Sequence, residues 1–314
     1  MLVLDRNNGG VEHRIFRDLP DYLRAGDLLV FNDTRVIPAR IFASKVPSGG
    51  RVELLLLNRV DLTRWEALVG GKGMTAGREV DAGDGLRARV LEVLDGSRRL
   101  IEFSEPVEKH LPAIGHVPLP PYIHAELKDQ ERYQTIYARL PGSAAAPTAG
   151  LHFTPQLLEK IHGMGVNTAF VDLHVGLDTF APVTEENADE HLIHSEWCEL
   201  SAETADLINQ TRARGGRVIA VGTTTVRTLE SAANQPGDRS AGILPFSGNT
   251  RLFILPGYQF KVVDAMITNF HLPKSTLLML VSAFAGREHI LAAYQQAVAQ
   301  NYRFFSFGDA MLIA

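Results

Sequence analysis

The sequence predicts an α/β fold: a discontinuous three-layer α/β main domain with an inserted small β-barrel domain. Helix and strand patterns alternate along the second half of the chain, which is typical of a largely parallel sheet with helices on both faces. Short strand patterns broken by glycine turns crowd between Arg51 and Phe103, as in small barrels. Strand patterns that suit the main sheet lie on both sides of that stretch. We therefore expect residues 1–49 and 110–314 to form the main domain and residues 50–109 the barrel.

The first part of the chain supplies strands to both expected domains. The segment GDLLVFNDTRVIPARIF, from Gly26 to Phe42, is interpreted as paired strands of the main sheet. The insert contains the strand patterns RVELLLLN, WEALVG, GLRARVLEVL and RRLIEF. The alternation of apolar residues slips at Val90 and Leu91, which predicts a β-bulge.

The second half of the chain alternates helices and strands. FTPQLLEKIHGMG predicts a helix capped by Thr154 with Pro155 at its first position. SAETADLINQTRARGG predicts a capped helix that ends at Gly215 and Gly216, and RVIAVGT a buried strand after it. The remaining predicted elements are a helix in TVRTLESAAN, strands in RLFIL and AMITNF, and helices in KSTLLMLVSAFAG and REHILAAYQQAVAQ.

Composition narrows the class of protein. Hydrophobic residues make up 45% of the 314 residues and charged residues 21%, which is ordinary for a globular chain. The start MLVLDR lacks the apolar core of a signal peptide, and the single cysteine, Cys198, excludes an internal disulfide. We expect a cytoplasmic protein without a membrane span. The net charge of −5 limits nucleic-acid binding to local basic patches, such as the arginines of the insert.

An anion site is predicted where VGTTTVRTLES turns from a strand into a helix. Backbone N–H groups and the hydroxyls of Thr223, Thr224 and Thr225 suit a carboxylate or phosphate there. The alternative is that one threonine only caps the helix. Arg227 and Glu230 lie three residues apart on one helix face, as either a solvated ion pair or a ligand clamp.

Two histidines follow predicted strands and are candidates for proton transfer. His174 ends the strand in FVDLHVGLDTF, and His271 follows Asn269 before a helix that should begin at Pro273. Imidazole titrates near neutral pH, so either side chain can act as a general base, although a histidine in a strand is more often structural. Arg35 lies in FNDTRV, between two strands, where an exposed ion pair with Asp33 is the simpler interpretation.

The segment SAAAPTAGLHF is rich in small residues. A run of this kind suits a loop whose backbone approaches a ligand closely, with Thr148, His152 and Phe153 supplying polar and flat contacts. The histidines of HLIHSEWCE complete no known ligand spacing, so we expect no metal site.

Eight segments occur in an order that identifies a family. They are GDLLVFNDTRVIPARI, GHVPLPPYI, YQTIYA, AAPTAGLHFT, HSEW, VGTTTVRTLES, NFHLPKSTLLMLVSAFAG and YRFFSFGDAM. Together they resemble the S-adenosylmethionine:tRNA ribosyltransferase-isomerases of queuosine biosynthesis over nearly the whole chain. Members of that family usually carry a further segment before the one that matches LVLDR, and tend to have glycine where Asp178 stands.

The resemblance implies a reaction and its partners. The substrates would be S-adenosylmethionine and a tRNA with 7-aminomethyl-7-deazaguanine (preQ1) at the wobble position, and the products epoxyqueuosine in tRNA, adenine and methionine. The sulfonium acidifies the C5′ proton of the ribose, so the reaction needs a base and an acid, for which His174 and His271 are interchangeable candidates. Thr223, Thr224, Thr225 and Arg227 would bind the methionine carboxylate. We expect a monomer that needs no cofactor, since S-adenosylmethionine is consumed.

Two other functions remain open at this point. A methyltransferase would also use S-adenosylmethionine but would release no free adenine. A non-catalytic RNA-binding module would need a basic or aromatic stripe. If neither histidine were the base, the next candidates would be Asp172, Asp178 and Glu230.

Overall fold

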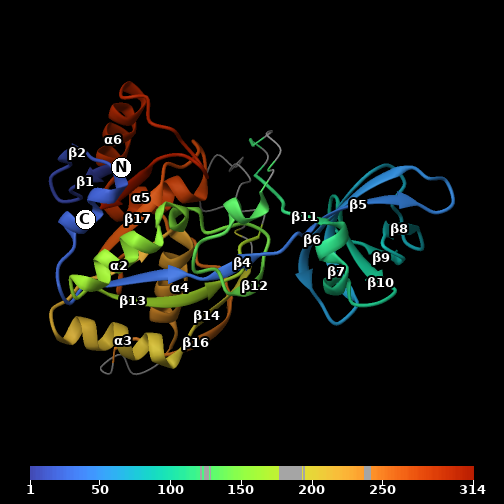
Figure 1. The fold of residues 1–314 in the computed structure, drawn as a ribbon, viewed down its shortest axis with the longest axis horizontal. Coiled ribbons are helices and arrows are strands. Elements are labelled where there is room, and N and C mark those ends of the chain that lie inside the picture. Colours follow the sequence, from blue (N-terminus) through green and yellow to red (C-terminus); the bar gives the residue numbers. More distant parts are fainter. Residues whose placement is uncertain (121, 124–126, 128, 177–192, 194, 237–241) are drawn as a thin grey trace. The chain divides into compact units, whose positions relative to one another are not determined.

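The computed structural model describes residues 1–120, 122–123, 127, 129–176, 193, 195–236 and 242–314, and these form two compact units (Figure 1). Unit 1 consists of Met1–Arg35, Arg132–Leu140 and Ala146–Ala314. Unit 2 consists of Val36–Glu131 and Pro141–Ala145. Unit 1 is therefore built from three separate stretches of the chain.

Unit 1 contains a nine-stranded sheet. Its strands, in spatial order, are β16 (Phe246–Thr250), β14 (Glu196–Leu200), β13 (Asn167–Leu173), β3 (Leu28–Asn32), β15 (Val218–Val221), β17 (Ala265–Asn269), β18 (Ala310–Ile313), β1 (Leu2–Leu4) and β2 (Val11–His13). The four central strands β13, β3, β15 and β17 run parallel, and antiparallel strands flank them. The carboxyl ends of the four parallel strands therefore meet at one edge of the sheet, which we call the carboxyl edge.

Apolar side chains cover both faces of this sheet, which makes the three layers. On one face Leu28 and Val30 pack with the helices α3 (Ala202–Ala213), α4 (Thr223–Asn234), α5 (Thr276–Ala285) and α6 (Arg287–Ala299). On the other face Leu29 and Phe31 pack with α2 (Pro155–Gly163) and the 3₁₀ helices η1 (Phe16–Tyr22) and η4 (Thr148–His152). Strand β3 is buried on both faces, which explains its unbroken apolar run. The predicted three-layer α/β fold is confirmed.

Side-chain caps start three of these helices. Thr154 accepts a hydrogen bond from the Leu157 N–H at α2, as predicted, and Ser201 caps α3 in the same way. Helix α5 begins at Thr276 with Ser275 as its cap, so the predicted start at Pro273 is wrong. The predicted strand RLFIL is also wrong, because β16 ends at Thr250, just before it. No single helix among the described residues is long and apolar enough to cross a membrane.

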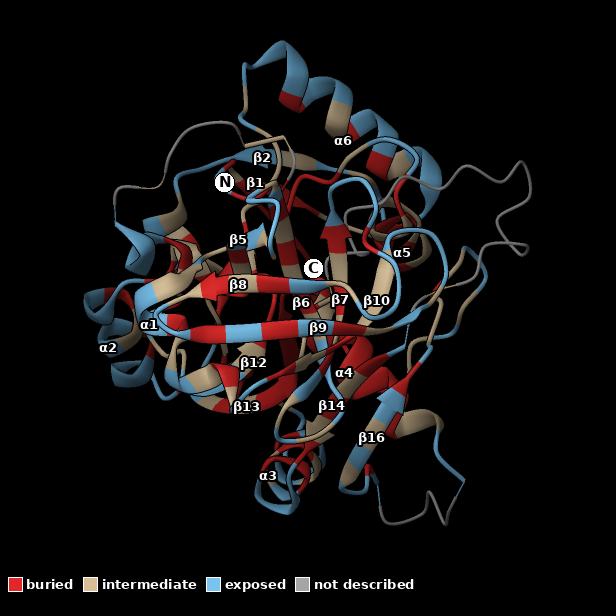
Figure 2. Cartoon of the chain, turned by 90° about the vertical axis from the view of Figure 1, so that its right-hand side faces the viewer, coloured by how far each residue is buried: buried red, intermediate tan, exposed pale blue. Residues whose placement is uncertain are grey.

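Unit 2 is a closed antiparallel barrel. Six strands close in the order β5 (Arg40–Lys45), β6 (Arg51–Arg59), β7 (Arg64–Gly70), β10 (Arg98–Phe103), β9 (Leu86–Val93) and β8 (Glu79–Gly83), and β8 pairs back onto β5. In Figure 2 buried and exposed residues alternate along β9, as expected for a strand with one face in a core. The register between β9 and β10 shifts at Leu91, where the predicted bulge lies. The short elements are η2 (Val107–Lys109), α1 (Leu111–Ile114) and β11 (Gly115–His116).

The boundaries of unit 2 differ from the predicted ones. The chain leaves unit 1 after Arg35, and β5 joins the barrel, where Ile41 and Ala43 are buried in the core. The segment GDLLVFNDTRVIPARIF is therefore divided between the two units: β3 stays in the main sheet and β5 joins the barrel, so the prediction that both strands belong to the main sheet is wrong. The chain re-enters unit 1 through η3 (Gln130–Tyr133), and a two-stranded sheet joins β4 (Thr34–Val36) to β12 (Leu140–Ser143).

Candidate active site

Three predicted site residues form a hydrogen-bonded chain at the carboxyl edge. The Thr148 hydroxyl lies 2.9 Å from Asn269 Oδ1, and Asn269 Nδ2 lies 3.1 Å from His152 Nε2. With the hydroxyl donating to Oδ1, the amide donates to Nε2. His152 then carries its proton on Nδ1. The structure thus brings together residues from η4 and the end of β17 that are far apart in the sequence.

The surroundings of His152 keep its ring neutral. The ring stacks on Phe16 with a centroid distance of 4.9 Å and an interplanar angle of 28°. Burial lowers the pKa of His152 from 6.5 to about 4. The neighbouring Phe153 is only 2% exposed and packs edge-on against Phe16 and Phe31. Phe153 therefore packs in the core beneath the site. Its aromatic face, which was predicted to contact a ligand, is covered by protein side chains.

The small residues before His152 make room for the protein's own side chains. A Cβ on Gly150 would lie 1.9 Å from the Tyr137 hydroxyl and 2.8 Å from the Thr135 methyl group. Only glycine fits under this tyrosine. The sequence predicts a close approach to a ligand at this loop, and in the structure the group that approaches Gly150 closely is Tyr137.

Helix α4 begins at the carboxyl edge without a side-chain cap. Its N-cap is Gly222, whose φ of 93° lies in the region that favours glycine, so the alternative of a threonine cap is wrong. The N–H groups of Thr223, Thr224 and Thr225 precede the first helical hydrogen bond, which Val226 donates to Gly222. Thr224 Oγ1 has no hydrogen-bond partner among the described residues. The Thr225 hydroxyl, in contrast, is buried and donates to the Val221 carbonyl at 2.8 Å.

The two charged residues of α4 have different partners. Arg227 pairs with Glu196 of β14, and its Nη2 has no hydrogen-bond partner within the described part of the chain. Glu196 also accepts the Gly176 N–H at 2.9 Å. Glu230 is fully buried and accepts hydrogen bonds from the Tyr258 hydroxyl and from the backbone N–H groups of Lys261, Val262 and Val263. Arg227 and Glu230 are therefore buried and paired with different groups, so the interpretation as a solvated ion pair is wrong.

His174 lies just beyond β13, beside a buried carboxylate. Its Nε2 is 3.6 Å from Asp172 Oδ1, and its ring lies 5.0 Å from the Trp197 ring. The side chain of His174 is 34% exposed, whereas Asp172 is 7% exposed. His174 thus combines access to solvent with an acidic neighbour, which is the setting of a general base.

A second carboxylate, Asp33, follows β3 on the adjacent strand. It pairs with Arg139 at 2.7 Å and is 1% exposed, so the predicted exposed pair with Arg35 is wrong. Burial raises the pKa of Asp33 against the effect of Arg139, and Asp172 acts in the same direction as burial. Arg35 itself is half-buried on β4. Asp33 and Asp172 both end buried strands, and that position was the only sequence signal for them.

His271 is buried, and both its side chain and its backbone N–H have hydrogen-bond partners. Its Nε2 lies 2.8 Å from Thr268 Oγ1, and its backbone N–H donates to the Tyr294 hydroxyl. Burial lowers the pKa of His271 from 6.5 to about 4. A neutral, 9% exposed imidazole with this hydrogen bond resembles a structural histidine more closely than His174 does.

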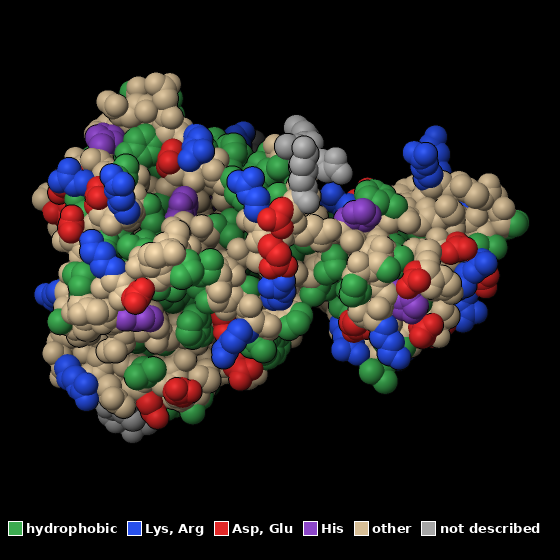
Figure 3. Space-filling model, viewed as in Figure 1, with side chains coloured by type: hydrophobic (Ala, Val, Ile, Leu, Met, Phe, Trp, Pro, Cys, Tyr) green, Lys and Arg blue, Asp and Glu red, His purple; other side chains and the backbone are tan. Residues whose placement is uncertain are grey.

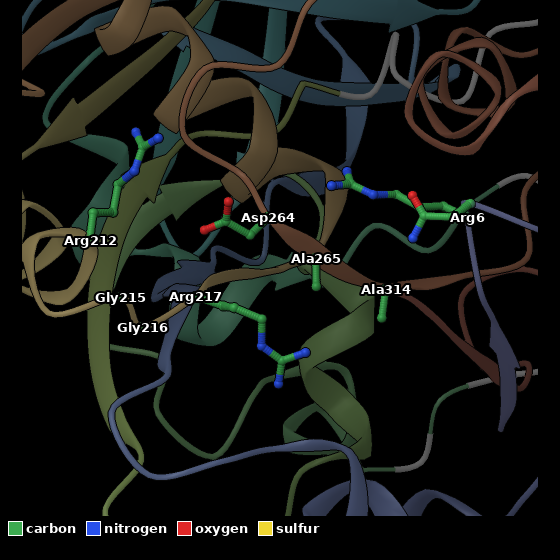
Figure 4. A pocket seen from close by; sticks show the side chains of 9 residues that line it. Arg6, Arg212, Gly215, Gly216, Arg217, Asp264, Ala265 and Ala314 are labelled. Carbon is green, nitrogen blue, oxygen red and sulfur yellow. The ribbon is translucent and has the colours of Figure 1, made fainter.

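A cavity of about 420 Å³ lies at the opposite edge of the sheet, where β15 and β17 begin. Arg6, Arg212 and Arg217 line it, with Asp264 between them (Figure 4). Arg217 is bound to Asp27 and Arg212 to the Lys261 carbonyl, and in Figure 4 these two guanidinium groups point in opposite directions. Among the described residues that line the cavity, these two donors therefore do not converge on one point.

Neither a metal nor a thiol nucleophile is indicated by the described residues. No group of three or more His, Cys, Asp or Glu side chains in them could hold a metal ion. Burial raises the pKa of Cys198 to about 11, which keeps the thiol protonated. Asp178 and the two histidines of HLIHSEW lie outside the described residues.

Comparison with known proteins agrees over the whole chain. A family model described as "Queuosine biosynthesis protein" matches residues 1–313. Proteins named S-adenosylmethionine:tRNA ribosyltransferase-isomerase from Desulforamulus reducens and Pelotomaculum thermopropionicum are 53% and 56% identical, over all of this chain and 92% of theirs. The crystal structure of S-adenosylmethionine tRNA ribosyltransferase from Thermotoga maritima is 40% identical, with a TM-score of 0.55 over 100% of this chain and 91% of that one. The chain belongs to the queuosine biosynthesis protein family.

Proposed function

We propose that this protein transfers the ribosyl group of S-adenosylmethionine to tRNA and isomerises it. The observation that carries the proposal is the identity above 50%, across both units, to proteins named for that reaction. The acceptor is preQ1 at the wobble position, and the products are epoxyqueuosine in tRNA, adenine and methionine. The proposal takes the enzyme as a cytoplasmic monomer that needs no metal or redox cofactor.

His174 is the proposed base for the first proton transfer. The sulfonium of S-adenosylmethionine acidifies the C5′–H bond, and the base removes that proton so that the ribose ring can open and adenine can leave. His174 is favoured over His271 because it is more exposed and has a carboxylate beside it. His271 would have to give up its hydrogen bond to Thr268 before it could act as base or acid.

The start of α4 is the proposed site of the methionine carboxylate. The N–H groups of Thr223, Thr224 and Thr225 and the positive end of the helix dipole favour an anion there. The Thr224 hydroxyl and Arg227 Nη2, which have no partner in the part of the chain that the structure describes, add donors whose burial would otherwise be unfavourable. Thr225 takes part only through its backbone, because its hydroxyl is bound to Val221.

The chain of Thr148, Asn269 and His152 is the proposed contact for the adenosine part of the substrate. Its hydrogen bonds fix the Nδ1–H form of His152, which presents a donor to a ring nitrogen or a ribose oxygen. Arg35 stays a proposed contact. Phe153 and Glu230 are withdrawn from substrate contact, because both are buried and their partners belong to the protein itself.

Binding of tRNA must rely on local patches of charge. On the face drawn in Figure 3, basic and acidic side chains are interspersed without a continuous basic area. Four arginines of the barrel, expected from the sequence to bind phosphates, form ion pairs: Arg59, Arg64, Arg87 and Arg89. Each of these pairs would have to open before the arginine could bind phosphate.

Product analysis separates the candidate functions. The protein is incubated with S-adenosylmethionine and a tRNA that carries preQ1, and the small molecules and the tRNA mass are measured. The proposed reaction gives one adenine and one methionine for each modified tRNA. Release of S-adenosylhomocysteine would indicate a methyltransferase, and binding without any product would indicate an RNA-binding module.

A further inference from the structure

Asp172 is a buried carboxylate, and the ion pair recorded for it among the described side chains is with His174. Asp172 is 7% exposed, and its Oδ1 has no hydrogen-bond partner among the described residues. A buried carboxylate oxygen without a donor is energetically unfavourable. An imidazole N–H that moved closer to Oδ1 would remove this cost.

The positions of the two side chains determine which ring nitrogen of His174 can bind Asp172. Asp172 lies in β13 and His174 directly follows its last residue, Leu173, and the ion-pair distance shows that the two side chains lie on the same side of the chain. His174 Nε2, and not Nδ1, is the ring nitrogen recorded beside Asp172 Oδ1, at 3.6 Å. Hydrogen bonds between catalytic groups are often long in the free enzyme and shorten when substrate binds. With Nε2–H donating to the carboxylate, Nδ1 keeps the lone pair that can take up a proton.

We propose that Asp172 is the positioning residue of the reaction, because it holds the Nε2–H form of His174 and stabilises the imidazolium that forms when Nδ1 accepts the C5′ proton. The proton stays on His174 Nδ1 after the transfer, and the electron pair of the C–H bond stays on the substrate. Asp172 gains no proton. The inference rests on the proposed function for the identity of the substrate.

Two other carboxylates of neighbouring strands form ion pairs with arginines. Asp33 on β3 is paired with Arg139, and Glu196 on β14 is paired with Arg227 of α4. Glu199 lies opposite Asp172 in the register between β13 and β14, and it is half-buried. Among these carboxylates, Asp172 has the imidazole of His174 as its recorded ionic neighbour. Removal of its charge should therefore affect His174 more than removal of the Glu199 charge.

The test compares Asp172→Asn with Glu199→Gln as the matched control. Single-turnover adenine release is followed from pH 5 to 9, together with the dissociation constant of S-adenosylmethionine. We expect Asp172→Asn to slow release at least about tenfold and to move the acidic limb of the pH profile to lower pH, because the base loses its stabilising charge. Binding of S-adenosylmethionine should change less than about twofold, and Glu199→Gln should behave like the wild type.

A double variant shows whether Asp172 acts through His174. In the His174→Ala background, Asp172→Asn should cause no further loss, whereas independent roles would multiply. A further loss of tenfold, or an Asp172→Asn profile that coincides with the wild type, would overturn the inference while leaving the proposed function intact.

Nitrogen NMR of the wild-type protein provides a readout that does not depend on activity. The spectrum of His174 should show the Nε2–H form. An Nδ1–H form would overturn the inference. If the wild type released no adenine while the NMR result held, the proposed function would fail and the Asp172–His174 pair would stand.

Discussion

At the scale of single residues, buried charged side chains of unit 1 are of two kinds. Glu230 is satisfied by four groups of its own chain, whereas Arg227 and Asp172 each keep a polar atom without a partner among the described residues. The sequence placed these residues near strand ends and on one helix. The sequence could not distinguish a buried charge that has its partners from one that lacks them, because the partners of Glu230 come from a distant loop that has no periodic pattern.

Glu230→Gln should destabilise the protein without affecting its chemistry. The amide would point a donor at backbone N–H groups that need an acceptor, so we expect a loss of about 2–3 kcal/mol in the free energy of unfolding. Urea denaturation measures this loss, with the exposed Glu203→Gln of α3 as control. Normal stability combined with loss of adenine release would mean that Glu230 is a site residue after all.

His271 should make stability depend on pH. The pKa of an unfolded histidine is near 6.5, whereas burial holds the pKa of His271 at about 4, so between these values the unfolded chain binds more protons. Stability is therefore complete above about pH 6.5 and is lost as the pH falls towards 4. A shift of this size corresponds to about 3 kcal/mol.

His271→Gln should remove that part of the pH dependence. Denaturant titrations at pH 7 and pH 5 compare the variant with the wild type, and His162→Gln on the exposed side of α2 is the control. Because His152 has the same sign of shift, some dependence should persist in the variant. Identical pH dependence in the variant and the wild type would show that His271 is not held neutral by burial.

At the scale of elements, local chemistry in the sequence predicted most starts and irregularities. The caps Thr154 and Ser201 and the bulge at Leu91 depend on neighbours only a few residues away, so a single segment contains the whole signal. The strand β5 was assigned to the wrong sheet for the opposite reason. Its alternation of apolar residues is the same in any half-buried strand, and its partners β6 and β8 are decided by tertiary structure.

Gly222→Ala should impair the start of α4 in two ways. A φ of 93° strains any residue with a Cβ, so we expect a loss of about 1–2 kcal/mol in stability. The relaxed backbone should also misplace the threonine N–H groups and weaken binding of S-adenosylmethionine. Gly215→Ala is the matched control, because Gly215 has a φ of 75° and open space around its Cβ, but lies beyond α3. Equal binding in the two variants, measured by calorimetry, would argue against an anion site at α4.

At the scale of the whole molecule, a block of short strand patterns followed by alternating helix and strand patterns was enough to predict a barrel inserted in an α/β domain. The boundaries were not predictable, because the chain passes into the barrel after Arg35, and the strand pattern that follows suits either sheet equally well. We propose that the barrel folds independently when it includes Val36–Glu131.

Two fragments test this proposal about the barrel. Residues 36–131 should give a cooperative thermal transition, because they contain all six strands that close the barrel. Residues 50–109 should not, because they lack β5, which closes the barrel between β6 and β8. Circular dichroism melting distinguishes the two. A cooperative transition in the shorter fragment would show that β5 is dispensable.

The most direct test of the proposal that His174 is the base is single-turnover adenine release by His174→Ala, beside His271→Ala and the exposed control His162→Ala. We expect His174→Ala to slow release by about 10²–10⁴-fold while S-adenosylmethionine binding changes little. His271→Ala should lose stability but keep a rate within about tenfold of the wild type per folded molecule, a difference under about 1.4 kcal/mol of barrier. If His174→Ala keeps more than about a tenth of the wild-type rate, His174 is not the base.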